Sequence, residues 1–339
     1  MTASPSALPV VELWCRDVIS CLQATFGSVL RHAGHDPLDV LGLHWEFRHK
    51  PGDVRSEEFY YPCATPGDLA ASLAPHHPVS SAWHQADELD RPLDALADEL
   101  SRGRLVIAAV DNFHLPFRPA FGDVHAAHLL VVYGIDEHNV HVSDAMPPDF
   151  AGPIPVADFL RSWSSANPTD VQDAFFSDSR IDRRYLTVDV GAEFPTLDRA
   201  LLAKALDHSL ELFHGPSHGD RTGLAGLGEF LDEVLKAAET ADSATVRDVY
   251  PFGWGMQAQS GLHGELLRTW GLREDVPAVR EAGRLVETVA HKWTGLRVCA
   301  AHGHPEPEAA AKELARHANA LRQAYESAVD GLAEARSAL

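Results

Sequence analysis

The chain has 339 residues, 45% of them apolar, so it is long enough for two folded domains or one large one. Its 49 acidic side chains outnumber 28 lysines and arginines, and the resulting formal charge of −21 argues against nucleic acids and anionic membranes as partners. No apolar run is long enough to cross a membrane and the N-terminus lacks the pattern of a signal peptide, so we expect a globular cytoplasmic protein.

The first predicted helix begins at a cysteine. Ser20 is a good N-cap, Cys21 takes the first helical position, apolar residues follow the helical period through 22–30, and Gly34 suits the C-cap. Unpaired backbone N–H groups and the positive end of the helix dipole favour a thiolate at Cys21 and could stabilise an oxyanion. The alternative is a structural cysteine at the start of a packed helix.

The other cysteines show no pattern that indicates a disulfide framework, a zinc site or an activated thiol. The chain contains four cysteines, at Cys15, Cys21, Cys63 and Cys299. They are too few for a disulfide framework, and no CxxC spacing suggests zinc. Cys15 lies in an expected extended segment, where no helix dipole would activate it. Residues 1–9, with Pro5 and Pro9, are expected to form an extended lead-in.

Residues 36–62 predict a short helix followed by a hairpin-like, aromatic region. Its aromatic side chains could line an acyl pocket, but we favour a place in the core; they are Trp45, Phe47, Phe59, Tyr60 and Tyr61. Residues 68–73 and 93–102 predict helices, the second of which ends at Gly103.

The central stretch, residues 105–144, predicts three strands. Residues 105–110 and 129–133 are almost all apolar, as in strands buried on both faces. His128 stands at the edge of the second of these strands, and Asp144 ends the alternating strand that follows. Adjacent antiparallel strands could place the two side by side, as a base and the group that orients it.

The remainder divides into a short mixed region and a helical half. Residues 147–155 are expected to be a loop, a helix follows from near Val156, and residues 183–191 predict one more strand. A boundary is expected at 193–195, and from Leu197 the pattern is helical, without strands. The glycine-rich segment 215–228 lacks the ending and preceding strand of a phosphate loop. A second glycine-rich segment, near residue 253, is expected to lead into a helix.

Twenty histidines are scattered along the chain. The pair His76 and His77 could bind a metal, but no carboxylate-spaced cluster accompanies it, so we interpret these residues as solvated. The sequence therefore predicts neither a metal nor a cofactor.

Several segments, in this order, resemble the butirosin biosynthesis protein H family. They are CLQATFGSVLRHAGHD, LVIAAVDNFHLPFRP, HAAHLLVVYGID and VHVSDAMPP. The resemblance implies an α+β fold: a papain-like cysteine-enzyme domain with an antiparallel sheet at residues 10–192, followed by an all-α helical domain at 196–339. The papain-like domain of the family is also similar to bacteriocin-processing peptidase domains.

The resemblance also implies a catalytic triad of Cys21, His128 and Asp144. His125 is the alternative base, and His128 is preferred because it abuts the buried strand. In the peptidases a glutamine some six residues before the cysteine serves the oxyanion hole, whereas Cys15, Arg16 and Asp17 occupy that neighbourhood here. This departure weakens a peptidase interpretation and leaves the backbone N–H of Cys21 as an expected oxyanion donor.

Family members resemble acyltransferases of secondary metabolism, such as antibiotic biosynthesis. The implied partners are an acyl or peptidyl carrier protein as donor and a small-molecule amine as acceptor; a homo-oligomer is left open. Since carrier proteins are acidic, as this chain is, docking calls for a local basic patch. The candidates are Arg48 with Lys50, or Arg180 with Arg183 and Arg184.

Three other functions stay open. A thioesterase, peptide cyclase or peptidase would use the same acyl-enzyme and differ only in the nucleophile that reaches it. A non-catalytic scaffold would bind a carrier protein without reacting. A metal site would need His125, His128 and either Asp144 or Asp123 to converge.

Overall fold

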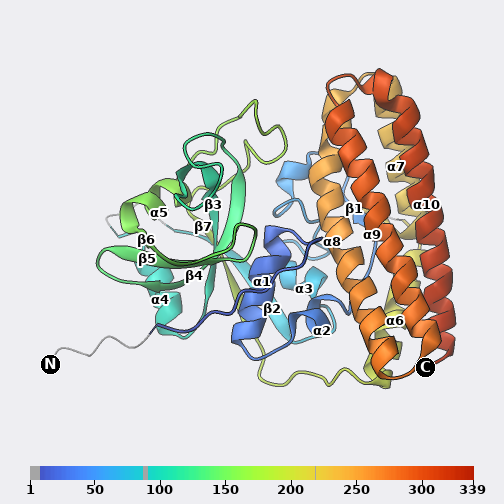
Figure 1. The fold of residues 1–339 in the computed structure, drawn as a ribbon, viewed down its shortest axis with the longest axis horizontal. Helices are drawn as coiled ribbons and strands as arrows, with labels where there is room; N and C mark the ends of the chain where they lie inside the picture. Colours follow the sequence, from blue (N-terminus) through green and yellow to red (C-terminus); the bar gives the residue numbers. More distant parts are fainter. Residues whose placement is uncertain (1–7, 87–90, 218) are drawn as a thin grey trace. The chain divides into compact units, whose positions relative to one another are not determined.

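The computed structural model of the protein describes residues 8–86, 91–217 and 219–339 (Figure 1). Most of the expected lead-in, residues 1–7 with Pro5, and His218 of the glycine-rich segment lie outside the described residues. The chain forms two compact units. The first contains the residues up to Arg16, Cys21–Pro37 and Ser80–Val190, and the second contains Asp17–Ser20, Leu38–Val79 and Gly191–Leu339. The domain limits 10–192 and 196–339 stay a prediction.

The first unit is built on a six-stranded sheet. Its spatial order is β2-β7-β3-β4-β5-β6. The strands are β2 (Val79–Gln85), β3 (Val106–Asp111), β4 (Ala127–Ile135), β5 (Asn139–Asp144), β6 (Phe150–Pro155) and β7 (Arg184–Val190). The pairs β7–β3, β3–β4, β4–β5 and β5–β6 run antiparallel, so the start of β4 and the end of β5 lie next to each other. The predicted α+β class, with an antiparallel sheet before helices, is confirmed.

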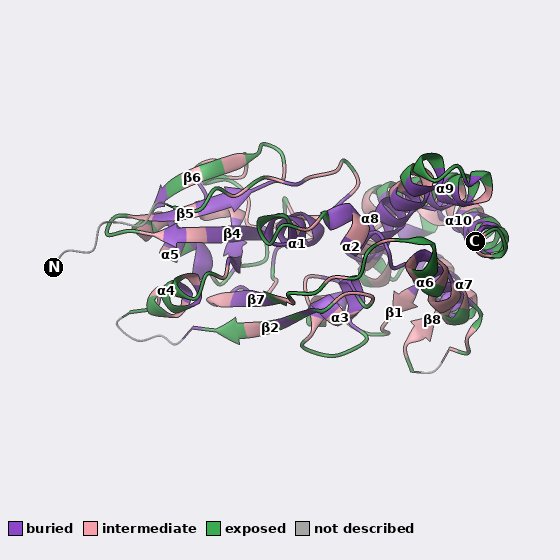
Figure 2. Cartoon of the chain, turned by 90° about the horizontal axis from the view of Figure 1, so that it is seen from below, coloured by how far each residue is buried: buried purple, intermediate pink, exposed green. Residues whose placement is uncertain are grey.

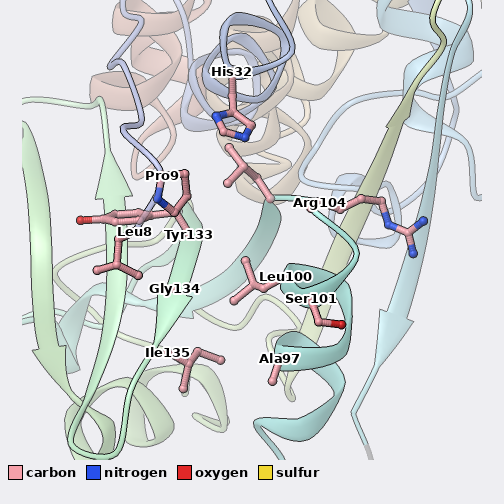
Figure 3. A pocket seen from close by; sticks show the side chains of 12 residues that line it. Leu8, Pro9, His32, Ala97, Leu100, Ser101, Arg104, Tyr133, Gly134 and Ile135 are labelled. Atoms are coloured by element: carbon pink, nitrogen blue, oxygen red, sulfur yellow. The ribbon is translucent and has the colours of Figure 1, made fainter. Parts of the chain in front are cut away.

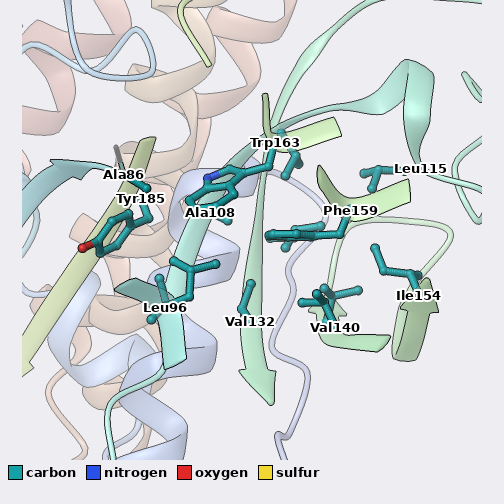
Figure 4. Close-up of a cluster of buried hydrophobic side chains, with 14 residues drawn as sticks. Ala86, Leu96, Ala108, Leu115, Val132, Val140, Ile154, Phe159, Trp163 and Tyr185 are labelled. Carbon is teal, nitrogen blue, oxygen red and sulfur yellow. The ribbon is translucent and has the colours of Figure 1, made fainter. Parts of the chain in front are cut away.

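The α-helices among the described residues of this unit are α1 (Cys21–His32), α4 (Asp94–Ser101) and α5 (Val156–Trp163). Figure 4 shows the apolar cluster in which strand residues such as Val132 and Val140 pack with Phe159 and Trp163 of α5. α1 packs against β4, and its residues 22–30 are all buried (Figure 2). A helix buried along this length fixes its first residue firmly relative to the strands.

Both edge strands differ from the sequence prediction. Residues 147–155 were expected to be a loop, but residues 150–155 form β6, and β2 was not predicted at all. β6 contains Pro153 and Pro155, which an edge strand accommodates because its outer N–H groups need no partner. These prolines hide the strand from a pattern-based prediction.

The second unit is mainly helical and confirms the predicted helices of the C-terminal half. Its long helices are α6 (Arg199–His214), α7 (Gly223–Glu239), α8 (Ser243–Arg273), α9 (Pro277–Gly303) and α10 (Pro307–Ser337), and Figure 1 shows α8, α9 and α10 side by side. The segment near residue 253, expected to lead into a helix, lies inside α8, which also contains Pro251. None of the described helices is long and apolar enough to cross a membrane.

Short elements contribute the rest of the second unit. They are α2 (Pro37–Leu41), β1 (Arg48–His49), the 3-10 helix η1 (Val54–Ser56), α3 (Leu69–Leu73) and β8 (Arg221–Thr222); a further 3-10 helix, η2 (Asn112–His114), belongs to the first unit. β1 pairs with β8, so the prediction that strands cease after residue 197 is wrong by this two-residue strand.

The aromatic residues near the start of this unit belong to its core. Trp45 is fully buried, stacks on Tyr325 with ring centroids 5.4 Å apart, and donates a hydrogen bond to Ser260 Oγ at 3.0 Å. Phe47, Tyr60 and Tyr61 are buried too. The interpretation of these side chains as core is confirmed for all but Phe59, which is partly exposed.

The buried face of α1 generates a prediction about stability. A Cβ atom at Gly27 would lie 2.1 Å from Cε3 of Trp14, so Gly27→Ala forces the indole or the helix to move. We expect a loss of about 1–3 kcal/mol in the free energy of unfolding, measured by denaturant titration. Gly228→Ala in α7 is the matched control: nothing lies within 4 Å of its new Cβ, and we expect a gain of about 0.5–1 kcal/mol. Equal effects of the two changes would contradict the tight packing of α1.

Candidate active site

Cys21 is the first residue of α1, as predicted. It is partly exposed, whereas the residues that follow it are buried. Its carbonyl oxygen accepts a hydrogen bond from Thr25 Oγ1 at 2.8 Å, within the first turn. The thiol therefore sits at the positive end of a well-anchored helix dipole.

His128 and Asp144 form a buried pair. Nε2 of His128, in β4, lies 2.8 Å from Oδ2 of Asp144, the last residue of β5. Both residues are at most 5% exposed. The register of the two strands explains the contact: Val131 stands opposite Ser143, so Asp144 lies one residue further toward the start of β4.

Cys21 interacts with the same imidazole. A hydrogen bond links its side chain to His128. Because Nε2 faces Asp144, Nδ1 is the nitrogen left for sulfur. The three residue types of a nucleophile, base and orienting carboxylate thus follow one another in space.

The surroundings of His128 favour its charged form. Burial lowers the pKa, but the Asp144 carboxylate and hydrogen bonds to Asp144 and Cys21 outweigh it and raise the pKa of His128 to about 9. The imidazolium is therefore the dominant form at neutral pH, and it can stabilise an adjacent thiolate.

Asp144 is held by more than the histidine. Burial opposes its ionisation, yet His128 and Arg118 together lower the pKa of this carboxyl. Nη1 of Arg118 lies 3.2 Å from Oδ2 of Asp144 and also donates to the carbonyl oxygen of Met146 at 3.1 Å. The backbone N–H of Met146 donates to Oδ1 at 2.9 Å. Arg118 lies in a loop without a sequence pattern of its own, and sequence reasoning missed it.

His125, the alternative base, belongs to a different pair. Its Nδ1 lies 2.7 Å from Oδ2 of Asp111, and its ring stacks on Phe113 with centroids 4.1 Å apart. Asp111 is fully buried and also accepts a hydrogen bond from Ser165. The geometry therefore brings His128, and not His125, to Cys21 and Asp144. Among the described residues, no candidate metal cluster combines His125, His128 and Asp123 or Asp144.

The other thiols lie in less reactive surroundings. No disulfide joins the four cysteines, all of which the structure describes. Burial raises the pKa of Cys63 and of Cys299, so both remain protonated at neutral pH. Cys15 donates a weak hydrogen bond to the carbonyl oxygen of Arg16.

The two predicted basic patches are largely paired with carboxylates. Arg48 contacts Glu46 and Asp220, and Lys50 lies 3.3 Å from Glu57. In the second patch, Arg180 and Arg183 contact Asp182, and the guanidinium of Arg184 lies over Trp83. Neither group presents a purely cationic surface, and docking of a carrier protein stays a prediction.

A cavity of about 390 Å³ lies at the far end of β4 from His128 (Figure 3). Tyr133, Gly134 and Ile135 line one side, and Ala97 and Leu100 of α4 line the other. His128 is the second residue of β4, whereas Tyr133, Gly134 and Ile135 are its last three residues. The cavity is therefore separate from the site formed by Cys21, His128 and Asp144.

Residues 20–145 match the family described as Butirosin biosynthesis protein H, N-terminal. The matched segment runs from just before Cys21 to just after Asp144 and confirms the resemblance expected from the sequence. No curated protein matches the chain. The description of that family names a biosynthesis protein.

The charged state of His128 gives a test of the pair. Its pKa of about 9 exceeds the ordinary 6.5, so the pair's contribution to stability is full below about pH 6.5 and is lost as the pH rises through 9. Asp144→Asn removes the carboxylate charge, and we expect the pKa of His128 to fall toward or below 6.5, measured by NMR titration of labelled imidazole. Asp136→Asn is the control, since that carboxylate contacts His141 instead. A midpoint unmoved by Asp144→Asn would contradict this electrostatic role.

Proposed function

Since residues 20–145 match the family described as Butirosin biosynthesis protein H, N-terminal, we propose that the protein is a cysteine-dependent acyltransferase of secondary-metabolite biosynthesis. Cys21 takes an acyl or peptidyl group from a carrier-protein thioester and passes it to an amine. The hydrogen-bonded series Cys21, His128 and Asp144 is the observation that supports this proposal.

The first half of the reaction forms the acyl-enzyme. The Cys21 thiolate attacks the thioester carbonyl, and backbone N–H groups at the start of α1 stabilise the oxyanion. The carbon–sulfur bond to the carrier then breaks, and the imidazolium of His128 gives its proton to the departing thiolate. One thioester replaces another, so no poor leaving group has to be expelled.

The second half needs His128 as a base. Once Cys21 is acylated, it no longer carries the charge and hydrogen bond that help to raise the pKa of His128. Neutral His128 then takes a proton from the attacking amine, the amide forms, and Cys21 leaves as the thiolate. Asp144 keeps the ring oriented and stabilises its positive charge in both halves.

The acyl-enzyme can be observed directly. We expect incubation with a carrier protein loaded with a benzoyl or acetyl group to add the mass of that group to the chain, with Cys21 as the modified residue in peptide mapping. Cys21→Ala should show no adduct, whereas Cys15→Ala should form it normally. An adduct that persists in Cys21→Ala would contradict the proposal, and absence from the wild type with both donors would favour a carrier-binding scaffold. Loss of the adduct to water without added amine would favour a thioesterase.

The two histidines provide a matched comparison. His128→Asn should slow acyl transfer about 10²–10⁴-fold, the usual contribution of a general acid–base group. His125→Asn, three residues away in the Asp111 pair, should leave the rate within a few-fold of wild type. Single-turnover transfer to a primary amine measures both. The reverse order of effects would make His125 the base.

A further inference from the structure

Three histidines that the proposed reaction does not use meet in the second unit. They are His44, in the segment after α2, His76, in the segment between α3 and β2, and His208, in α6. Each offers a ring nitrogen, and these nitrogens all lie within 4.8 Å of one another. The sequence separates the three by up to 164 positions, so only folding brings them together.

The distances between their ring centres are close to those of ligands around one small cation. With each nitrogen about 2 Å from a zinc ion, ring centres at tetrahedral angles lie about 5 Å apart. The observed distances between centroids are 5.2 Å for His76 and His208, 5.6 Å for His44 and His208, and 6.0 Å for His44 and His76. Small side-chain rotations would bring the nitrogens to bonding distance.

Two of these rings carry buried nitrogens that lack a hydrogen-bond partner among the described residues. His44 is only 2% exposed, and its Nδ1 is unsatisfied. Nε2 of His76 is unsatisfied as well. A buried polar atom without a partner is unfavourable, and a ligand shared by both nitrogens would remove that cost.

The other nitrogen of His44 has the partner that a metal ligand usually has. Nε2 lies 3.5 Å from Oε1 of Glu46, whose side chain is itself held by Arg48 at 3.1 Å. A carboxylate on the outer nitrogen fixes the orientation and tautomer of a metal-binding imidazole. With Glu46 on Nε2, Nδ1 is the nitrogen of His44 that is available to coordinate.

Charged side chains of both signs act on the cluster. Lys204 adds a positive charge nearby, while Glu46 and Glu211 act on His208 with the opposite sign. The carboxylates thus offset the lysine's repulsion of a dication.

We propose that His44, His76 and His208 bind one Zn²⁺ ion, with solvent as the fourth ligand. Nδ1 of His44 and Nε2 of His76 are the coordinating atoms. Three imidazoles without a carboxylate ligand suit zinc better than calcium or magnesium. The ion ties two parts of the 38–79 segment to α6, so it stabilises the second unit and takes no part in acyl transfer.

Metal analysis of the full-length protein tests the site. The probe is ZnCl₂ alone, added to chelator-stripped protein and measured by calorimetry and by elemental analysis after gel filtration. We expect one equivalent per chain and a rise in the melting temperature with Zn²⁺. Loss of a residue that only hydrogen-bonds to a metal ligand weakens metal binding roughly 10–100-fold. His208→Ala removes a ligand itself, so it should weaken Zn²⁺ binding by more than that. His214→Ala, an exposed histidine on the same helix, should bind as wild type does.

Two further variants distinguish this histidine cluster from the site formed by Cys21, His128 and Asp144. Cys21→Ala should retain the full equivalent of zinc, and His76→Ala should lose it while keeping the circular dichroism spectrum of the wild type. No stoichiometric binding by the wild type, or undiminished binding by His208→Ala, would overturn the proposal. Loss of zinc in Cys21→Ala but not in His208→Ala would assign the ion to the other centre.

Discussion

The buried contact between His128 and Asp144 is the interaction on which the proposed chemistry depends. Two charges so thoroughly removed from water are costly unless they are paired and hydrogen-bonded. Asp144 meets this condition with His128 and Arg118 on Oδ2 and the Met146 N–H on Oδ1. The carboxylate is therefore held ionised and fixed, and the imidazole beside it is held charged and oriented toward Cys21.

The architecture of the first unit serves this contact. Antiparallel pairing places the start of β4 beside the end of β5, and α1 is buried along most of its length, so Cys21 has little freedom relative to His128. A second histidine–aspartate pair lies close by in the sequence: buried Asp111 contacts His125, whose ring stacks on Phe113. That second pair shows that a histidine–aspartate contact alone does not define a nucleophilic site; the helix-start cysteine makes the difference.

Local patterns in the sequence were sufficient for much of this unit. The helical period after Cys21 and the apolar runs of β3 and β4 predict their elements, and the chain order of strands brings His128 to Asp144. The sequence pattern does not predict the edge strands, because β6 is rich in proline and β2 has no continuous apolar run. Arg118 and the three clustered histidines could not be found, since their partners lie far away in the sequence and only tertiary packing selects them. The assignment of Cys21, His128 and Asp144 as catalytic remains a proposal.

The pairing of Cys21 with His128 can be measured without knowing the substrate. Capping Cys21 with iodoacetamide removes its charge and its hydrogen bond, two of the causes that raise the pKa of His128 to about 9. NMR titration of labelled histidine before and after capping should therefore show a lower midpoint for His128 in the capped protein and an unchanged midpoint for His125. A His128 midpoint that capping leaves unmoved would contradict the pairing and, with it, the proposed acyl-enzyme mechanism.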